Sequence, residues 1–137
     1  MGWQKTITLA KRKKGCHLVT EEIVSHIQPG LQGVEVGMLF LFIKHTSAAL
    51  TVNENWDIGI VRLHMDMALD KIVPEDLEWK HTDEGPESAS HTKASLVGSS
   101  ISIPIAGGRL SLGTWQGVYL TEFRHAPHAR TVVATIL

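Results

Sequence analysis

The sequence lacks the features that define several large classes of protein. With a single cysteine, Cys16, among 137 residues, no internal disulfide bond can form, so a reducing and therefore cytoplasmic setting is expected. The longest apolar run, Met38 to Ile43, is far shorter than the roughly 20 residues of a membrane-spanning helix, and no membrane partner is expected. The motifs GxSxG and GxGxxG are absent, which leaves nucleophilic-serine chemistry and a dinucleotide-binding loop without support.

An excess of charge of either sign is also absent. Thirteen Lys and Arg against fourteen Asp and Glu give a formal net charge of -1, which argues against a broad basic surface and a nucleic-acid partner. Apolar residues make up 43% of the chain and charged residues 20%, an ordinary globular composition. The length predicts one domain, residues 1–137. The one surplus is eight histidines, which directs attention to metal binding and acid–base chemistry.

The periodicity of apolar residues predicts an α+β fold with a large, mixed, mostly antiparallel sheet and two main helices. Alternation predicts a strand at Trp3–Ala10, and the apolar segment Val36–Ile43 predicts a central strand covered on both faces. Thr20 is expected to cap a first helix that ends at Pro29 and Gly30. The remaining predicted strands are Leu50–Val52, Ile101–Ile105, Leu110–Leu112, Val118–Phe123 and Thr131–Leu137.

A second helix is predicted to run from an N-cap at Asp57 to about Val73. It has one continuous apolar stripe for the core. Ile60, Leu63 and Met67 lie on roughly the opposite side at helical spacing. This second apolar side has to be buried against another sheet or another subunit.

The following segment, Glu75–His91, is polar and without usable periodicity, so it is predicted to be a long irregular loop. A short helix is expected after it, at Lys93–Val97. The carboxylates of Asp83, Glu84 and Glu87 suit Mg²⁺, although a solvated run of charges is an equally ordinary explanation.

Three histidines stand next to predicted loops. His45 follows the predicted central strand, and His81 and His91 bracket the acidic segment. Two or three histidines that converge from separate loops, with one open position, form the usual layout of a catalytic metal site. The ten-residue spacing of His81 and His91 matches no standard zinc motif, so hydrogen-bonded surface histidines are the alternative.

Two other groups of residues suit a phosphorylated ring compound. Lys93 and Ser95 precede the segment Gly98–Ser100, and a cation, hydroxyls and an approachable amide can bind phosphate; an ordinary turn is the alternative. Between two glycines, Trp115 and Gln116 suit stacking on a flat ring and hydrogen bonding to its edge. A buried tryptophan beside a bulge explains the same residues equally well.

Several blocks of residues keep a common order along almost the whole chain: His45–Asn55, His81–Thr82, Glu84–Pro86, His91–Ser95 and Gly108–Gly117, followed by Glu122, Arg124 and Arg130. Together these blocks resemble the YjbQ-like family, known as secondary thiamine-phosphate synthases. The resemblance implies an α+β fold, assembly as a homotrimer and a divalent metal ion, Mg or Zn, bound by loop histidines. The implied activity is a weak thiamine-phosphate synthase, which joins a pyrimidine-methyl diphosphate to a thiazole phosphate and releases diphosphate.

The resemblance also assigns roles to residues. The implied metal ligands are His45, His81 and His91. The implied substrate-binding residues are Lys93, Ser95, Trp115, Gln116, Arg124 and Arg130. The candidate catalytic residues are Glu54, Lys93 and Gln116. Two other functions fit the same residues and leave open whether the chain is an enzyme: a trimer that binds a metal or phosphometabolite without turnover, and a metal-dependent hydrolase.

Overall fold

The computed structural model describes residues 1–56, 58–77, 79 and 85–137. Within these ranges three helices and eight strands are present, which confirms the predicted α+β class. In chain order they are β1 (Trp3–Thr8), β2 (Gly15–Leu18), α1 (Thr20–Leu31), β3 (Val36–Ile43), β4 (Ala48–Glu54), α2 (Ile58–Ile72), α3 (Gly85–Val97), β5 (Ser100–Ala106), β6 (Arg109–Leu110), β7 (Gln116–Glu122) and β8 (Thr131–Ile136).

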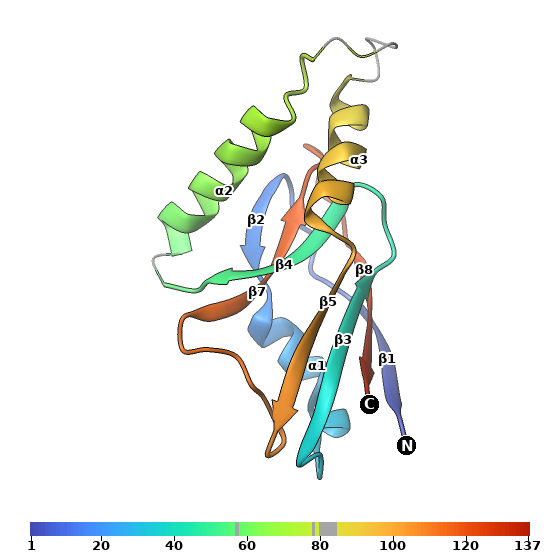
Figure 1. The fold of residues 1–137 in the computed structure, drawn as a ribbon. Coiled ribbons are helices and arrows are strands. Elements are labelled where there is room, and N and C mark those ends of the chain that lie inside the picture. The colour runs from blue at the N-terminus through green and yellow to red at the C-terminus, as the bar shows by residue number, and fades with distance from the viewer. Residues whose placement is uncertain (57, 78, 80–84) are drawn as a thin grey trace.

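The strands form two sheets. The large sheet has the order β1-β8-β3-β5-β6 and the small sheet the order β2-β7-β4. All the strand pairs observed in them are antiparallel. Figure 1 shows α1 against the large sheet, α2 beside β2, and α3 above the start of β5, where it contacts β4. No helix within the described ranges has the length and apolar character needed to cross a membrane.

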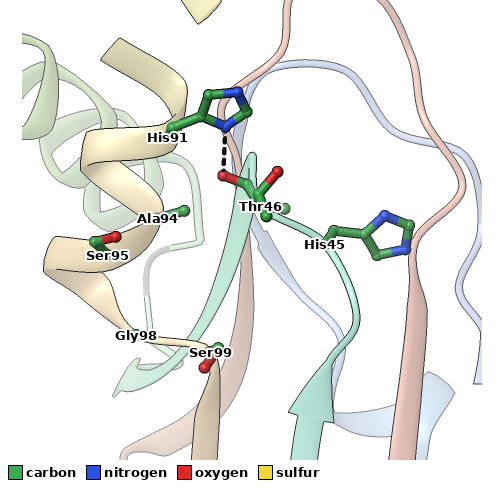
Figure 2. Close-up of a pocket in the computed structure, with 8 residues that line it drawn as sticks. His45, Thr46, His91, Ala94, Ser95, Gly98 and Ser99 are labelled. Carbon is green, nitrogen blue, oxygen red and sulfur yellow. Dashed lines mark hydrogen bonds between the residues drawn. The ribbon is translucent and has the colours of Figure 1, made fainter. Parts of the chain in front are cut away.

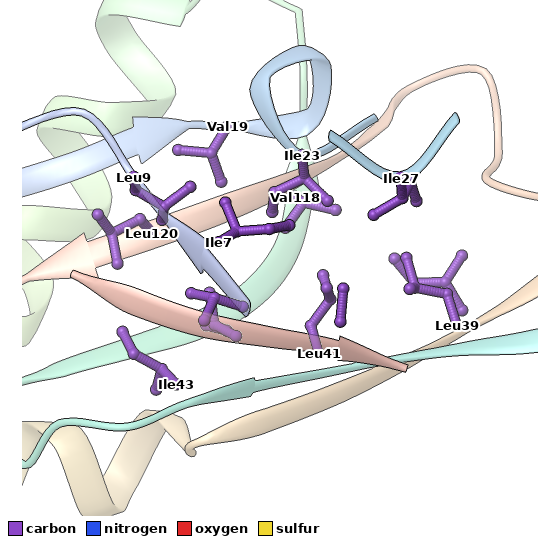
Figure 3. Packing of buried hydrophobic residues seen from close by; sticks show 14 of the residues in the cluster. Ile7, Leu9, Val19, Ile23, Ile27, Leu39, Leu41, Ile43, Val118 and Leu120 are labelled. Atoms are coloured by element: carbon purple, nitrogen blue, oxygen red, sulfur yellow. The ribbon is translucent and has the colours of Figure 1, made fainter. Parts of the chain in front are cut away.

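The core lies between the two sheets and α1. Leu39, Leu41 and Ile43, every second residue of β3, are buried there because side chains alternate between the faces of a strand. Ile23 and Ile27, one helical turn apart in α1, pack over them. Figure 3 shows these side chains meeting others from β1 and β7. The residues that the small sheet adds to this core include Ala48, Leu50, Val118 and Leu120.

The other face of β3 is open, so the prediction that both faces are covered is wrong for a single chain. Val36, Phe40 and Phe42 alternate with the core residues and are 89%, 41% and 49% exposed. The residues opposite them on β5 are small: Ser102 faces Phe40, and Ser100 faces Phe42. A continuous apolar run predicts that both faces are apolar, but it does not say which molecule covers the second. We call Val36, Phe40 and Phe42 the sheet face.

The helix α3 starts inside the segment that was predicted to be an irregular loop. Pro86 lies in its first turn, where the missing N–H of proline costs no hydrogen bond, and Glu87 follows as an acidic residue near the helix N-terminus. Periodicity missed this helix because its buried residues form no apolar stripe; they are Ala89, Ser90 and Lys93. The predicted helix at Lys93–Val97 is the last part of α3. The predicted N-cap Asp57, together with Asp83 and Glu84, lies outside the described residues.

The helix α1 differs from its prediction at both ends. Val19, and not Thr20, is the N-cap residue, and the hydroxyl of Thr20 accepts a hydrogen bond from the backbone N–H of Val118 at 2.8 Å. At the other end the helix continues through Pro29 to Leu31. Leu31 is buried in the core, and this burial offsets the backbone hydrogen bond that proline cannot donate.

Ion pairs hold α2 to the rest of the chain. The ammonium group of Lys14 lies 2.9 Å from Asp66 and 2.8 Å from Asp70, which are one turn apart on α2. Asp70 also contacts the ammonium group of Lys93 at 2.5 Å, and Lys93 is only 1% exposed. The position of α2 is therefore coupled by charge both to the segment before β2 and to α3.

The side of α2 that faces solvent is apolar. Ile60, Leu63 and Met67, which the sequence placed on a second apolar side, are all exposed. Trp56 precedes the helix, and its ring meets the ring of Trp115 edge to face, with centroids 5.3 Å apart. Both tryptophans are exposed, so a buried Trp115 is excluded. We call these five residues the helix patch.

Candidate functional site

The structure divides the predicted site residues into two groups at opposite ends of the small sheet. In the pairing of β4 with β7, Ala48 lies opposite Glu122 at one end, and Glu54 lies opposite Gln116 at the other. Six residues of extended strand put these ends about 20 Å apart. His45, His91, Lys93, Ser95, Arg124 and Arg130 lie toward the first end, and Glu54, Trp115 and Gln116 lie at the second. One copy of the chain therefore does not bring the predicted residues into a single site.

The first group surrounds a cavity of about 570 Å³ between α3 and the start of β4, which we call the α3 cavity. His45, His91 and Ser95, all predicted site residues, belong to its lining (Figure 2). The other lining residues are Thr46, Ala48, Ala94, Gly98 and Ser99. Of the residues predicted to bind phosphate here, Ser95, Gly98 and Ser99 therefore line a cavity, and Lys93 and Ser100 are not part of its lining.

His91 is oriented through both nitrogens of its ring. Nδ1 lies 2.8 Å from the carbonyl oxygen of Thr46, so it carries a proton and donates it (Figure 2). Nε2 lies 3.0 Å from a carboxylate oxygen of Glu87, one turn earlier in α3. A neutral ring protonated at Nδ1 would present a lone pair to that carboxylate. The contact is therefore favourable only with a proton or a metal cation between the two groups.

Glu87 also pairs with Arg124. Its two carboxylate oxygens lie 3.0 and 3.2 Å from Nη1 of Arg124, and both side chains are roughly 40% exposed. His91, Glu87 and Arg124 thus form an accessible set of charged and titratable groups beside the α3 cavity. Glu87 was not predicted as the partner of His91 because the sequence predicted an irregular loop there. Their i, i+4 spacing is the signal that identifies the pair once a helix is assumed.

The other two predicted phosphate-binding cations are buried in ion pairs. Arg130 is 4% exposed, and its Nε and Nη2 donate to Glu122 at 2.6 and 2.5 Å. Lys93 is bound to Asp70 inside the fold. A phosphate would have to displace the carboxylate of Glu122 to reach Arg130, or that of Asp70 to reach the buried ammonium of Lys93, so we assign both cations to the stability of the fold. Among the three predicted phosphate-binding cations, the geometry leaves Arg124 as the accessible one.

The ring of His45 is turned toward β8 and away from His91 (Figure 2). Its Nε2 accepts a hydrogen bond from the backbone N–H of Thr131 at 2.8 Å, so the ring proton is on Nδ1. Burial lowers the pKa of His45, and the charge of Arg130 lowers it further. The ring is therefore neutral and has a structural role, and the predicted metal coordination would require the bond to Thr131 to break.

The bond from Thr131 to His45 gives the chain a pH-dependent stability. The folded pKa lies below the ordinary value of 6.5, so this contribution is complete above pH 6.5 and is lost as the pH falls through the folded pKa. Across that range we expect the free energy of unfolding, from urea denaturation, to fall by about 1 kcal/mol more in the wild type than in His45→Gln. Glutamine retains an acceptor but does not titrate. The exposed His64→Gln should follow the wild type, and a wild-type profile for His45→Gln would contradict the assignment.

The metal site predicted from three histidines is incomplete in the part of the chain that the structure describes. His81 lies outside that part, and within it no three His, Cys, Asp or Glu side chains are grouped to hold a metal ion. The pair of His91 and Glu87 does fit a cation. Nitrogen and carboxylate ligands suit zinc better than magnesium, and a ligand histidine usually donates its second N–H to a carbonyl group, as His91 does to Thr46.

The second group of predicted residues adjoins another cavity, of about 630 Å³, where Gln116, Asn55 and Arg62 meet the start of α1. The amide nitrogen of Asn55 donates to the carbonyl groups of Thr114 and Gln116, and the side-chain oxygen of Gln116 accepts the N–H of Gly113. These bonds hold the turn before β7 in place. Nε of Arg62 is buried and has no hydrogen-bond partner among the described residues. Arg62 was not predicted as a site residue because it belongs to no recognisable motif.

Comparison with known proteins places this chain among closely similar sequences. The model of the family described as UPF0047 protein YjbQ-like matches residues 5–137. The UPF0047 protein YjbQ of Salmonella typhimurium is 44% identical over 137 residues, which cover 99% of this chain and 98% of that protein. A UPF0047 protein of Synechocystis is 36% identical and covers 97% of this chain and 90% of its own length.

Solved structures share the fold. An uncharacterised protein of the YjbQ/UPF0047 family from Clostridium acetobutylicum has a TM-score of 0.79 at 36% identity, over 98% of this chain and 99% of its own. A protein of Sulfolobus solfataricus, described as YbjQ-like and of unknown function, has a TM-score of 0.86 over 99% of this chain and 96% of its own. At 20% identity the second likeness concerns the fold alone.

Proposed function

The chain belongs to the UPF0047 YjbQ-like family, and on this premise we propose that it is a weak, metal-dependent thiamine-phosphate synthase. The substrates are a pyrimidine-methyl diphosphate and a thiazole phosphate, and the products are thiamine phosphate and diphosphate. The observation that supports a phosphate-handling site is the accessible set of His91, Glu87 and Arg124 beside the α3 cavity. The synthase activity itself comes from the family resemblance.

The chemistry of these groups fits the departure of diphosphate, in which negative charge develops on the leaving oxygen. A metal ion held by Nε2 of His91 and the carboxylate of Glu87 would neutralise part of that charge. The guanidinium group of Arg124 is planar and can bind two phosphate oxygens at once. The hydroxyl groups of Ser95 and Ser99, which line the cavity, can donate to further oxygens.

We also propose that three copies of the chain assemble. The helix patch and the sheet face are two apolar surfaces exposed on one small domain, and monomeric proteins seldom leave such surfaces uncovered. Assembly would bury them. It would also affect the site, because the predicted site residues are divided between the two ends of the small sheet.

The function is tested by incubating the purified chain with both precursors and Mg²⁺ or Zn²⁺ and following the phosphorus NMR spectrum. Formation of thiamine phosphate and diphosphate in equal amounts is the expected result. Release of inorganic phosphate without coupling would replace the synthase by a metal-dependent hydrolase. Binding of either precursor without any turnover would replace it by a phosphometabolite-binding protein.

The proposed metal ligands predict a loss of metal affinity. We expect His91→Ala and Glu87→Gln each to raise the dissociation constant of Zn²⁺, measured by calorimetry, by at least about 10- to 100-fold. His64→Ala, an exposed histidine on α2, is the matched control and should bind as the wild type does. Unchanged zinc affinity in both variants of the α3 residues would remove the metal from this site.

A further inference from the structure

The two exposed apolar surfaces of the chain belong to different elements and have different shapes. The helix patch is a ridge of side chains on α2 with the tryptophan pair at one end. The sheet face is a row on β3 bordered by small serines of β5. We propose that the helix patch of one copy packs on the sheet face of the next copy, and that this contact brings Trp115 and Gln116 to the α3 cavity of the neighbour.

The two surfaces cannot meet within one chain. In β7, Val118 and Leu120 point into the core between the sheets, and Tyr119 points the other way, toward Arg62 of α2. The helix α2 therefore packs on the outer side of the small sheet, and the sheet face is the outer side of the large sheet, so core side chains of both sheets lie between the two surfaces. Any contact between helix patch and sheet face is a contact between two copies.

A helix stripe and an open sheet face are complementary, because packing a helix on a sheet is one of the stable layer arrangements of proteins. The five side chains of the helix patch are each about half exposed and offer on the order of 500 Å². With a polar rim, this approaches the roughly 800 Å² that each partner contributes to a standard interface. A contact that joins unlike surfaces repeats around a ring when its rotation closes, which accommodates three copies.

The same contact would complete the divided site, and this part of the inference rests on the proposed function. Phe42 of the sheet face lies opposite Ser100, and the preceding residue, Ser99, lines the α3 cavity, so this end of the sheet face is next to the cavity. In the helix patch, Trp115 directly precedes Gln116. Packing one surface on the other therefore sets a flat aromatic ring and an amide beside the cavity of the neighbour, where they can bind the ring of a substrate.

Engineered cysteines test the contact without any need for turnover. We expect the double variant Phe42→Cys with Leu63→Cys to form covalent dimers and trimers on oxidation, detected by denaturing electrophoresis. We expect the same of Ser99→Cys with Trp115→Cys under a short bis-maleimide linker. Cys16 is 4% exposed and contributes little background. The control pairs Leu63→Cys with Gln28→Cys, on the exposed side of α1, and should stay monomeric.

Each outcome decides the inference. Cross-linking of Leu63→Cys alone would show like surfaces in contact and overturn it, and so would a wild type that is monomeric in light scattering. Cross-linking of the first pair without the second would overturn the shared site. If Phe42→Cys fails to fold, Ser102→Cys on the adjacent strand takes its place. These cross-linking measurements involve neither metal nor precursors. A negative result would therefore overturn the proposed contact without contradicting the proposed synthase activity, which the phosphorus NMR assay tests separately.

Discussion

Replacing Glu122 with glutamine is expected to lower the free energy of unfolding by about 3–5 kcal/mol, the usual cost of breaking a buried ion pair. The carboxylate of Glu122 is fully buried and accepts two hydrogen bonds from Arg130, at 2.6 and 2.5 Å. Nη2 of Arg130 also donates to the hydroxyl of Ser47 at 2.9 Å. Glutamine has nearly the same shape but no charge, so the buried guanidinium would remain without a counterion.

Urea denaturation measures this cost, and the chain offers a matched control. Glu87→Gln removes a carboxylate from an exposed pair with Arg124 and should change the free energy of unfolding by at most about 1 kcal/mol. Similar values for Glu87→Gln and Glu122→Gln would contradict a stabilising role for the buried pair. In that case the assignment of Arg130 to the stability of the fold would fall, and Arg130 would again be a candidate for phosphate binding.

Asp70→Asn is expected to cost about 2–4 kcal/mol, somewhat less than a fully buried pair, because the side chain of Asp70 is 43% exposed. Its removal leaves the buried ammonium of Lys93 with no carboxylate partner among the described residues and takes one of two carboxylates from Lys14. Since these pairs attach α2 to the remainder of the chain, we expect hydrogen exchange to accelerate first in α2. A uniform change across the molecule would contradict this attachment.

The same variant should reveal the titration of Asp70. Burial by itself raises the pKa of Asp70, but hydrogen bonds from Lys14 and Lys93 outweigh burial, and the folded pKa lies below the ordinary 3.8. The stability it contributes is therefore complete above pH 3.8 and is lost as the pH falls through the folded pKa. The difference in stability between wild type and Asp70→Asn should narrow in that acid range.

Much of the fold could be predicted because the pattern of apolar residues indicates most of its helices and strands. The continuous apolar run of β3 and the helical stripe of α2 place those elements within a few residues of their bounds. The helix α3 could not be predicted in this way, because a lysine faces inward there beside alanine and serine. The burial of this lysine, Lys93, depends on its ion pair with Asp70, which lies 23 residues earlier in the chain. Only the folded structure brings the two side chains together.

The sequence predicts which residues have the chemistry of a functional site, but it does not predict which of them lie close together in the fold. The motifs that contain His91 and Gln116 were both predicted to bind ligands because of their side-chain chemistry. No local pattern predicts that they lie at opposite ends of the β4–β7 pair. Likewise, the sequence does not distinguish Arg124, which is accessible, from Arg130, which is buried. Strand register and ion pairing decide these points, and both are properties of the folded chain.

The buried position of Cys16 determines how this thiol responds to oxidants. Burial, together with the nearby carboxylate of Asp66, raises the pKa of this thiol to about 12. At neutral pH the thiol is therefore almost entirely protonated, and the thiolate is the form that peroxide attacks. Sulfenic acid and mixed disulfides with glutathione should therefore form slowly on the native protein. Cys16 acts as a small apolar residue in this fold, and it reacts readily only after the chain has opened.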